Sequence, residues 1–251
     1  MPPQPPPSSD PAAGLHVDQR GDGEPLLLLH GFTGSHADWF HLFPEPPRGF
    51  RCIAPDLPGH GRSASPFVSF RKSAERVAAV LEALGVRRFR AIGLSGGAQA
   101  LLHQATALPQ AVESMVLVST APYFPSRARE LMGLMDPEDR GEAEWTTMRG
   151  RHHLGDDQIR ALWRAGHDLK DSYDDVNFTP PSLARIRART LVVHGDRDPL
   201  YDVEQALALH TGIAESHLWI LPNGGHLPIF GDDSAEFVRR SLAFLRGEWT
   251  Q

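Results

Sequence analysis

The chain of 251 residues contains a single cysteine, Cys52. One thiol excludes an internal disulfide and a cluster of thiolates around a metal, and it fits a reducing compartment. We therefore expect a cytoplasmic protein. Cys52 lies in the apolar stretch "FRCIAPDL", which predicts a thiol buried in the core.

Long apolar runs and clustered basic charge are also missing. The longest run, "PLLLLH", is far shorter than the ~20 residues of a membrane span. The net charge of −6 comes from mixed signs spread along the chain, whereas binding to phosphates needs a basic stripe. We expect neither a membrane segment nor a nucleic-acid partner, and the sequence contains no signal for an oligomeric state. Arginine greatly outnumbers the two lysines, Lys72 and Lys170, which indicates a GC-rich bacterial genome.

Proline is concentrated at the start of the chain. Residues 1–13, "MPPQPPPSSDPAA", contain six prolines and lack the basic start and apolar stretch of a secretory signal. This composition predicts a disordered, extended tail rather than a leader. Residues 14–251 are expected to form one domain, because α/β folds of this length are often undivided.

From Leu26 onward, short apolar runs alternate with segments of helical period. This alternation predicts an α/β fold with a mostly parallel sheet and helices on both faces, and the near-continuous apolar runs favour strands covered on both sides. The expected strands are residues 26–30, 51–57, 88–95, 114–120, 190–195 and 217–223. Apolar residues at three- and four-residue intervals predict helices over 77–84, 98–105 and 238–249.

The alternation stops between residues 121 and 183, where no convincing strand appears. This stretch contains Trp145, Trp163, three methionines and mixed charges, at spacings more typical of packed helices than of a substrate site. We interpret it as a helical cap inserted after "VLVST", at the carboxyl edge of the sheet. Ligands bind at this edge in open α/β folds.

The stretch "GLSGG", residues 93–97, has the pattern G-x-S-x-G of a nucleophile elbow. In this elbow a sharp turn between a strand and a helix exposes the serine hydroxyl at the top of the sheet. The required strand and helix are predicted on either side of Ser95. Gly93 and Gly97 lack Cβ atoms, which would clash in so tight a turn.

A serine hydroxyl needs a base to accept its proton and a carboxylate to orient that base. "VVHGDRDPL" offers Asp196 and Asp198 directly after a strand, and their spacing leaves the choice between them open. "WILPNGGHLPIF" offers His226 after the last strand, so the order serine, acid, histidine is that of an elbow protein. His152, His153 and His167 form no metal-binding pattern and are expected to be solvated or packed.

The tetrahedral intermediate of acyl transfer also needs donors for its oxyanion. One is expected to be the backbone N–H of Gly96, which follows the candidate nucleophile, and the second comes from a loop after an early strand. "LLLLHGFTGSHADW" has the form of that loop, with Phe32 offering its N–H and His30 in a structural role. Phe32 and Trp39 could also wall a site, although core packing is an equal alternative for Trp39.

Together these residues resemble the α/β-hydrolase fold family, in particular its capped serine hydrolases. "HGFTGS", "DLPGHGRS", "GLSGG", "HGDRDPL" and "GGH" occur in the family's order within residues 15–249. The resemblance implies an α/β-hydrolase fold with a helical cap inserted after the sixth strand, and it selects Asp198 over Asp196 as the orienting acid. It also implies structural roles for Asp56, His60 and Arg62.

The resemblance implies a serine esterase that cleaves a small carboxylic ester or related acyl substrate through an acyl-enzyme. Ser95 would be the nucleophile, His226 the general base and acid, and Asp198 the orienting acid, with oxyanion donors at Phe32 and Gly96. This chemistry needs neither a metal nor an organic cofactor. Ser95 argues against the family's epoxide hydrolases and haloalkane dehalogenases, which use aspartate at the elbow.

Several alternatives stay open within the same resemblance. Serine members of the family also include carbon–carbon bond hydrolases, lactonases and cofactor-free perhydrolases. The loop "HGFTGSHADW" resembles that of the menaquinone-pathway lyase, but that enzyme usually carries an arginine where this chain has Ala98. A non-catalytic receptor for a small ligand on the same fold is the alternative from a different class.

Overall fold

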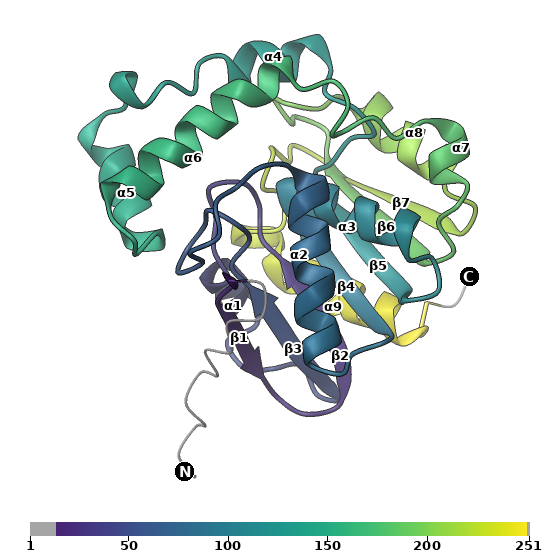
Figure 1. Ribbon diagram of the computed structural model, residues 1–251. Helices are drawn as coiled ribbons and strands as arrows, with labels where there is room; N and C mark the ends of the chain where they lie inside the picture. Colours follow the sequence, from purple (N-terminus) through teal and green to yellow (C-terminus); the bar gives the residue numbers. More distant parts are fainter. Residues whose placement is uncertain (1–13, 250–251) are drawn as a thin grey trace.

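The computed structural model describes residues 14–249, so the tail expected over residues 1–13 lies outside the described residues. A seven-stranded sheet runs through the described part of the chain in the order β1-β3-β2-β4-β5-β6-β7 (Figure 1). β1 is antiparallel to β3, and all other neighbours are parallel. The strands are β1 (Val17–Arg20), β2 (Glu24–Leu29), β3 (Phe50–Pro55), β4 (Phe89–Leu94), β5 (Val112–Val118), β6 (Arg189–Gly195) and β7 (Ser216–Leu221).

The six expected strands are confirmed as β2 to β7, within two residues at each end. β1 was not expected, because three of its four residues are polar and only Val17 is buried. Such a short strand at the edge of the sheet carries little of the apolar signal by which strands are recognised. Its role is to pair with β3 and close that edge.

Helices cover both faces of the sheet, as expected. α2 (Phe70–Ala83), α3 (Gly96–Ala107) and α8 (Val203–Gly212) pack on one face, and α1 (Ala37–Leu42) and α9 (Ser234–Arg246) on the other. The two-residue period of a strand divides its side chains between the two layers. In β2, Leu27 and Leu29 join the α2/α3 layer, while Leu26 and Leu28 join the α1/α9 layer.

Residues 121–183, here called the inserted segment, leave the sheet between β5 and β6 and carry helices rather than strands. Among the described residues of this segment, the only β pairing is an isolated bridge between Tyr123 and Asn177. Its elements are α4 (Ser126–Met132), η2 (Pro137–Asp139), α5 (Glu142–Arg151), α6 (Asp156–Asp168), η3 (Leu169–Asp171) and α7 (Pro180–Leu183). Figure 1 shows α4, α5 and α6 as an arm standing above the sheet.

The inserted segment follows "VLVST" as expected, and this strand is the fifth of the described residues. The resemblance had implied a position after the sixth strand. In the described residues only β1 precedes β2, so the inserted segment follows the fifth strand instead. The segment has a small apolar core of its own, formed by Met148, Ile159, Leu162 and Trp163.

Cys52 is a core residue, with 1% of its surface exposed. The buried core thiol expected from the sequence is therefore confirmed, and burial raises the pKa of this thiol to about 12. Within residues 14–249, no helix combines the length and the apolar character needed to cross a bilayer.

Candidate active site

Ser95 occupies a sharp turn between β4, which ends at Leu94, and α3, which begins at Gly96. Its φ of 49° and ψ of −114° lie in a region that residues with a Cβ rarely adopt. A Cβ on Gly97 would come within 2.2 Å of the Leu29 carbonyl oxygen, and one on Gly93 within 2.7 Å of the Ala98 Cα. The steric reason for both glycines is therefore confirmed.

The three side chains expected to act together do meet at one end of the sheet. The Ser95 hydroxyl donates to Nε2 of His226 across 2.9 Å, and Nδ1–H of His226 donates to Oδ2 of Asp198 across 2.8 Å. Ser95 follows β4, His226 follows β7 and Asp198 follows β6, and the carboxyl ends of these strands lie at the same edge of the sheet because β4 to β7 are parallel. Asp196, the other acid that the sequence offered, is exposed.

The Asp198 carboxylate is held by backbone as well as by His226. Its Oδ1 accepts N–H groups from Leu200 at 2.8 Å and Tyr201 at 3.2 Å. Burial alone would raise the pKa of Asp198, but the hydrogen bond and charge of His226 and the two N–H donors outweigh it, so the pKa lies below its ordinary value. The acid is therefore ionised and fixed in the orientation that His226 requires.

Phe32 and Gly96 approach each other closely beside Ser95. A Cβ on Gly96 would lie 2.8 Å from Cε1 of Phe70 and 3.2 Å from the Phe32 nitrogen, so a larger residue here would displace these neighbours slightly. Neither the Phe32 N–H nor the Gly96 N–H has a protein acceptor among the described residues. Both residues line the cavity that contains Ser95, so two free backbone donors are available there.

This cavity has a volume of about 710 Å³ and lies between the carboxyl end of β4 and the inserted segment. One part of the wall is apolar, and a polar part contains Asp38 and Arg151, whose charged groups lie 3.9 Å apart. Phe32 lines the cavity, whereas Trp39 is 1% exposed and packs in the core under α1. The apolar wall includes Phe70, Phe124, Met132, Met135, Leu169 and Leu200.

Two buried histidines connect the loop after β2 to the loop after β3. Nε2 of His30 accepts the Leu57 N–H at 3.0 Å, so its proton is on Nδ1, which donates to the Gly31 carbonyl at 2.8 Å. Nε2 of His60 likewise accepts the Thr33 N–H at 3.1 Å. Burial lowers the pKa of both imidazoles, most strongly that of His60. The structural roles expected for His30 and His60 agree with these contacts.

His152, which follows α5, makes two hydrogen bonds that the sequence did not reveal. It is 2% exposed, its Nδ1 accepts the Gly61 N–H at 2.9 Å, and its Nε2–H donates to the Thr33 carbonyl at 3.2 Å. Burial lowers its pKa to about 4, so the ring is neutral at neutral pH. His152 was expected to be solvated or packed because its spacing forms no metal-binding pattern. It is packed, and its hydrogen-bond partners lie far away in the sequence.

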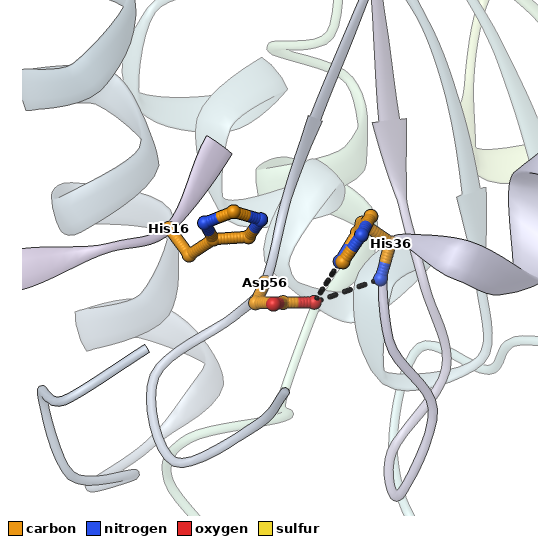
Figure 2. A group of neighbouring side chains, drawn as sticks. All are labelled: His16, His36 and Asp56. Atoms are coloured by element: carbon orange, nitrogen blue, oxygen red, sulfur yellow. Dashed lines mark hydrogen bonds and ion pairs between the residues drawn. The ribbon is translucent and has the colours of Figure 1, made fainter. Parts of the chain in front are cut away.

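A cluster of His16, His36 and Asp56 is the one group of metal-ligand type within the described residues (Figure 2). Oδ1 of Asp56 already accepts both the backbone N–H and Nδ1–H of His36, each at 2.8 Å, and Oδ2 accepts the Arg62 N–H at 2.8 Å. Burial raises the pKa of Asp56, but the hydrogen bonds and charge of His36, with His30, hold it well below its ordinary value. The carboxylate therefore ties two loops together, as expected for Asp56 and Arg62.

Known proteins resemble this chain in sequence and in fold. The pattern of the Alpha/beta hydrolase family matches residues 26–240. A 2-hydroxy-6-oxo-6-phenylhexa-2,4-dienoate hydrolase of Comamonas testosteroni is 24% identical over 92% of this chain and 91% of its own length. A pimeloyl-[acyl-carrier protein] methyl ester esterase of Nitrosospira multiformis is 27% identical, over 92% of this chain and 98% of its own length.

Among solved structures, a meta-cleavage product hydrolase from Pseudomonas fluorescens IP01 superimposes with a TM-score of 0.75. The two chains are 19% identical, and the match covers 94% of this chain and 96% of the other. Sheet order, helix layers and this likeness define a hydrolase-type α/β fold. With most of its length matched by the family pattern, the chain belongs to the alpha/beta hydrolase family.

Proposed function

We propose that the protein is a serine hydrolase that cleaves a small carboxylic ester or related acyl substrate through an acyl-enzyme. The observation that carries this proposal is the continuous chain of hydrogen bonds from Ser95 through His226 to Asp198, at 2.9 Å and 2.8 Å. Ser95 and His226 of this hydrogen-bonded series line a cavity of about 710 Å³, which is large enough for a small organic molecule.

In the first half of the reaction, Ser95 Oγ attacks the carbonyl carbon of the substrate while its proton passes to Nε2 of His226. The ionised Asp198 stabilises the resulting imidazolium and keeps the ring in the tautomer whose Nε2 is free to accept. The carbonyl oxygen becomes an oxyanion and accepts the N–H groups of Phe32 and Gly96. When the intermediate collapses, the alcohol leaves with the proton from His226, and the acyl group stays on Ser95.

In the second half, a water molecule takes the position of the alcohol. His226 removes a proton from this water as it attacks the acyl carbon, and the same two N–H groups bind the second oxyanion. Collapse releases the carboxylic acid, and the proton on Nε2 returns to Ser95 Oγ. His226 thus serves first as a base and then as an acid in each half of the cycle.

Labelling with a fluorophosphonate probe tests the nucleophile directly. We expect one adduct on Ser95 in the folded protein, because the probe captures a serine that is activated by a neighbouring base. Ser95→Ala should lose the adduct and roughly 10,000-fold or more of the ester turnover. Absence of the adduct, or turnover that survives in Ser95→Ala, contradicts the proposal.

Hydrolysis of a carbon–carbon bond is the second candidate, because one relative is a dienoate hydrolase. The esterase relative favours the ester instead. A series of p-nitrophenyl esters of graded chain length, measured beside a ring-cleavage dienoate, separates the two by the ratio of their kcat/KM values. Lactones, peracid formation and elimination of pyruvate complete the panel. A ligand that raises the Tm while all turnover stays negligible identifies the receptor instead.

We also retain two predictions from the sequence. A cytoplasmic location is supported by the sole thiol, and a bacterial source by the excess of arginine over lysine. Both are checked by the genomic context of the coding sequence and by fractionation of the cells that express it.

A further inference from the structure

The loop that contains Phe32 includes a strained residue. Thr33 has a φ of 66°, in the left-handed region that a β-branched side chain rarely adopts. Such a conformation persists only where the surrounding structure holds it. Thr33 directly follows Phe32, so the conformation of Thr33 constrains the backbone on the carboxyl side of the Phe32 N–H.

Two histidines hold the peptide groups on either side of Thr33. The Thr33 N–H donates to Nε2 of His60 at 3.1 Å, and the Thr33 carbonyl accepts Nε2–H of His152 at 3.2 Å. His60 belongs to the loop after β3, whereas His152 is the C-cap residue that follows α5 of the inserted segment. The strained residue is thus fixed from one side by the sheet domain, here residues 14–120 and 184–249, and from the other by the inserted segment.

The inserted segment also meets the Phe32 side chain. A Cβ added to Gly166 in α6 would lie 2.9 Å from Cε1 of Phe32, so this helix packs directly on the ring. Phe32 packs against both the core of the sheet domain and the small core of the inserted segment. Its position therefore depends on both parts of the molecule.

We propose that His152 is a positioning residue, which aims the Phe32 N–H at the oxyanion by holding the Thr33 carbonyl. The inference rests on the proposed function, since it concerns one of the two oxyanion donors. It adds that the oxyanion site is complete only while the inserted segment is docked. His152 touches neither substrate nor reacting atoms and acts through Thr33.

The protonation state of His152 suits this role. Because Nδ1 accepts the Gly61 N–H, the single proton of the neutral ring is on Nε2, where it can be donated to Thr33. The pKa of about 4, lowered first by burial, keeps this form through neutral pH. Substrate turnover near neutrality therefore finds the contact intact.

Two substitutions separate the contacts of His152. Asparagine places its carbonyl oxygen near the position of Nδ1, so His152→Asn can retain the Gly61 contact and loses the Thr33 contact. Glutamine places its amide nitrogen near the position of Nε2, so His152→Gln retains the Thr33 contact. With a p-nitrophenyl ester we expect kcat to fall roughly 10- to 100-fold in His152→Asn, with KM within about threefold, because an oxyanion donor acts on the transition state.

His152→Gln should recover most of that loss in kcat. The matched control is Gln158→Leu in α6, because the Gln158 amide donates to the carbonyls of Gly59 and Gly61 at 3.1 and 3.2 Å without contacting Thr33. This variant also weakens docking of the inserted segment, yet its kcat should stay within about threefold of the wild type. Equal losses of kcat in all three variants would show docking in general and overturn the inference.

A measurement on the unmodified protein guards against variants that fail to fold. Nitrogen-15 NMR of the histidine rings should find His152 as the Nε2–H tautomer at pH 7 and His60 as the Nδ1–H tautomer, with His152→Gln used for assignment. An Nδ1–H tautomer at His152 overturns the inference. A wild type with neither turnover nor a Ser95 adduct overturns the proposed function and this inference together, whereas normal kcat in a folded His152→Asn overturns the inference alone.

Discussion

The sheet domain and the inserted segment are built in different ways. The sheet buries apolar side chains on both of its faces, and Leu26 to Leu29 of β2 are all fully buried. In the inserted segment, α5 buries only Met148, and its surface carries exposed ion pairs such as Arg149 with Asp156. The sheet is held by packing on both faces, whereas α5 and α6 are held by a small core and a few polar contacts. The two ends of the inserted segment, for example Phe124 and Leu183, join the core of the sheet.

The difference indicates a division of labour at the site. Ser95, Asp198 and His226 all follow strands of the sheet, so the sheet carries the turn and loops that bring these three side chains together. The inserted segment supplies part of the cavity wall and holds Thr33 through His152. We expect changes in the sheet domain to alter chemistry or global stability, and changes in the segment to alter smaller, separable properties.

The largest expected effect comes from the sheet-held acid. Asp198→Asn removes the carboxylate that fixes the His226 tautomer, so kcat for ester hydrolysis should fall about 10,000-fold while the protein stays folded. Asp196→Asn is the matched control, because Asp196 lies two residues earlier and is exposed. Steady-state kinetics and circular dichroism check both. Comparable losses in the two variants would mean that Asp198 has no special relation to His226.

The second comparison concerns packing in the two parts. Leu28→Ala in β2 and Leu162→Ala in α6 remove the same atoms from sites that are 0% and 1% exposed. We expect Leu28→Ala to lower the free energy of global unfolding by about 2–5 kcal/mol. Leu162→Ala should instead speed amide hydrogen exchange within α5 and α6, with a smaller fall in Tm, because a weakly packed unit opens locally.

Hydrogen exchange followed by mass spectrometry and thermal unfolding measure both variants. Equal falls in Tm, without faster exchange confined to α5 and α6, would show that the two parts unfold as a single cooperative unit.

The smallest expected effect is a pH dependence at the contact between the parts. Burial, with the neighbouring His30, lowers the pKa of His152 from 6.5 to about 4, while Asp56 and the Thr33 carbonyl oppose the shift. The folded protein therefore resists protonation. The contribution of neutral His152 to the free energy of unfolding is therefore complete above pH 6.5. It declines as the pH falls toward 4, by at most about 1.4 kcal/mol per pH unit.

Urea unfolding at several pH values measures that decline. His152→Gln should show a shallower loss of stability between pH 6.5 and 4 than the wild type, because it lacks the buried titrating ring. His153→Gln, which changes the exposed neighbour, should keep the wild-type slope. Identical slopes in all three proteins would contradict the buried neutral state of His152.

The sequence predicted the sheet domain well because its signals are local. Apolar runs identified β2 to β7, and the five-residue elbow identified Ser95 together with the reason for Gly93 and Gly97. β1 was missed because a short edge strand needs few apolar residues, and α8 was not singled out by any periodic pattern. Local patterns thus report elements that pack along their whole length.

Contacts between distant residues were predicted less completely. The spacing of the "HGDRD" stretch left Asp196 and Asp198 equivalent, and in the structure only Asp198 reaches His226. His152 is packed, which was one of its two expected states, but its hydrogen bonds were not predicted because its partner Thr33 is 119 residues away. Whether a histidine is solvated or clamps a loop depends on how the inserted segment docks, which no local spacing encodes.

Because Cys52 is the single cysteine and is buried, its reaction with a thiol reagent can measure local opening of the sheet. A thiol with a pKa of about 12 and 1% exposure reacts with maleimides only when β3 separates from its covering layer. The rate of Cys52 labelling in the unmodified chain therefore measures how often the sheet opens at β3. A second thiol introduced at Leu134, which is 67% exposed in the inserted segment, would carry a fluorophore without competition from the first.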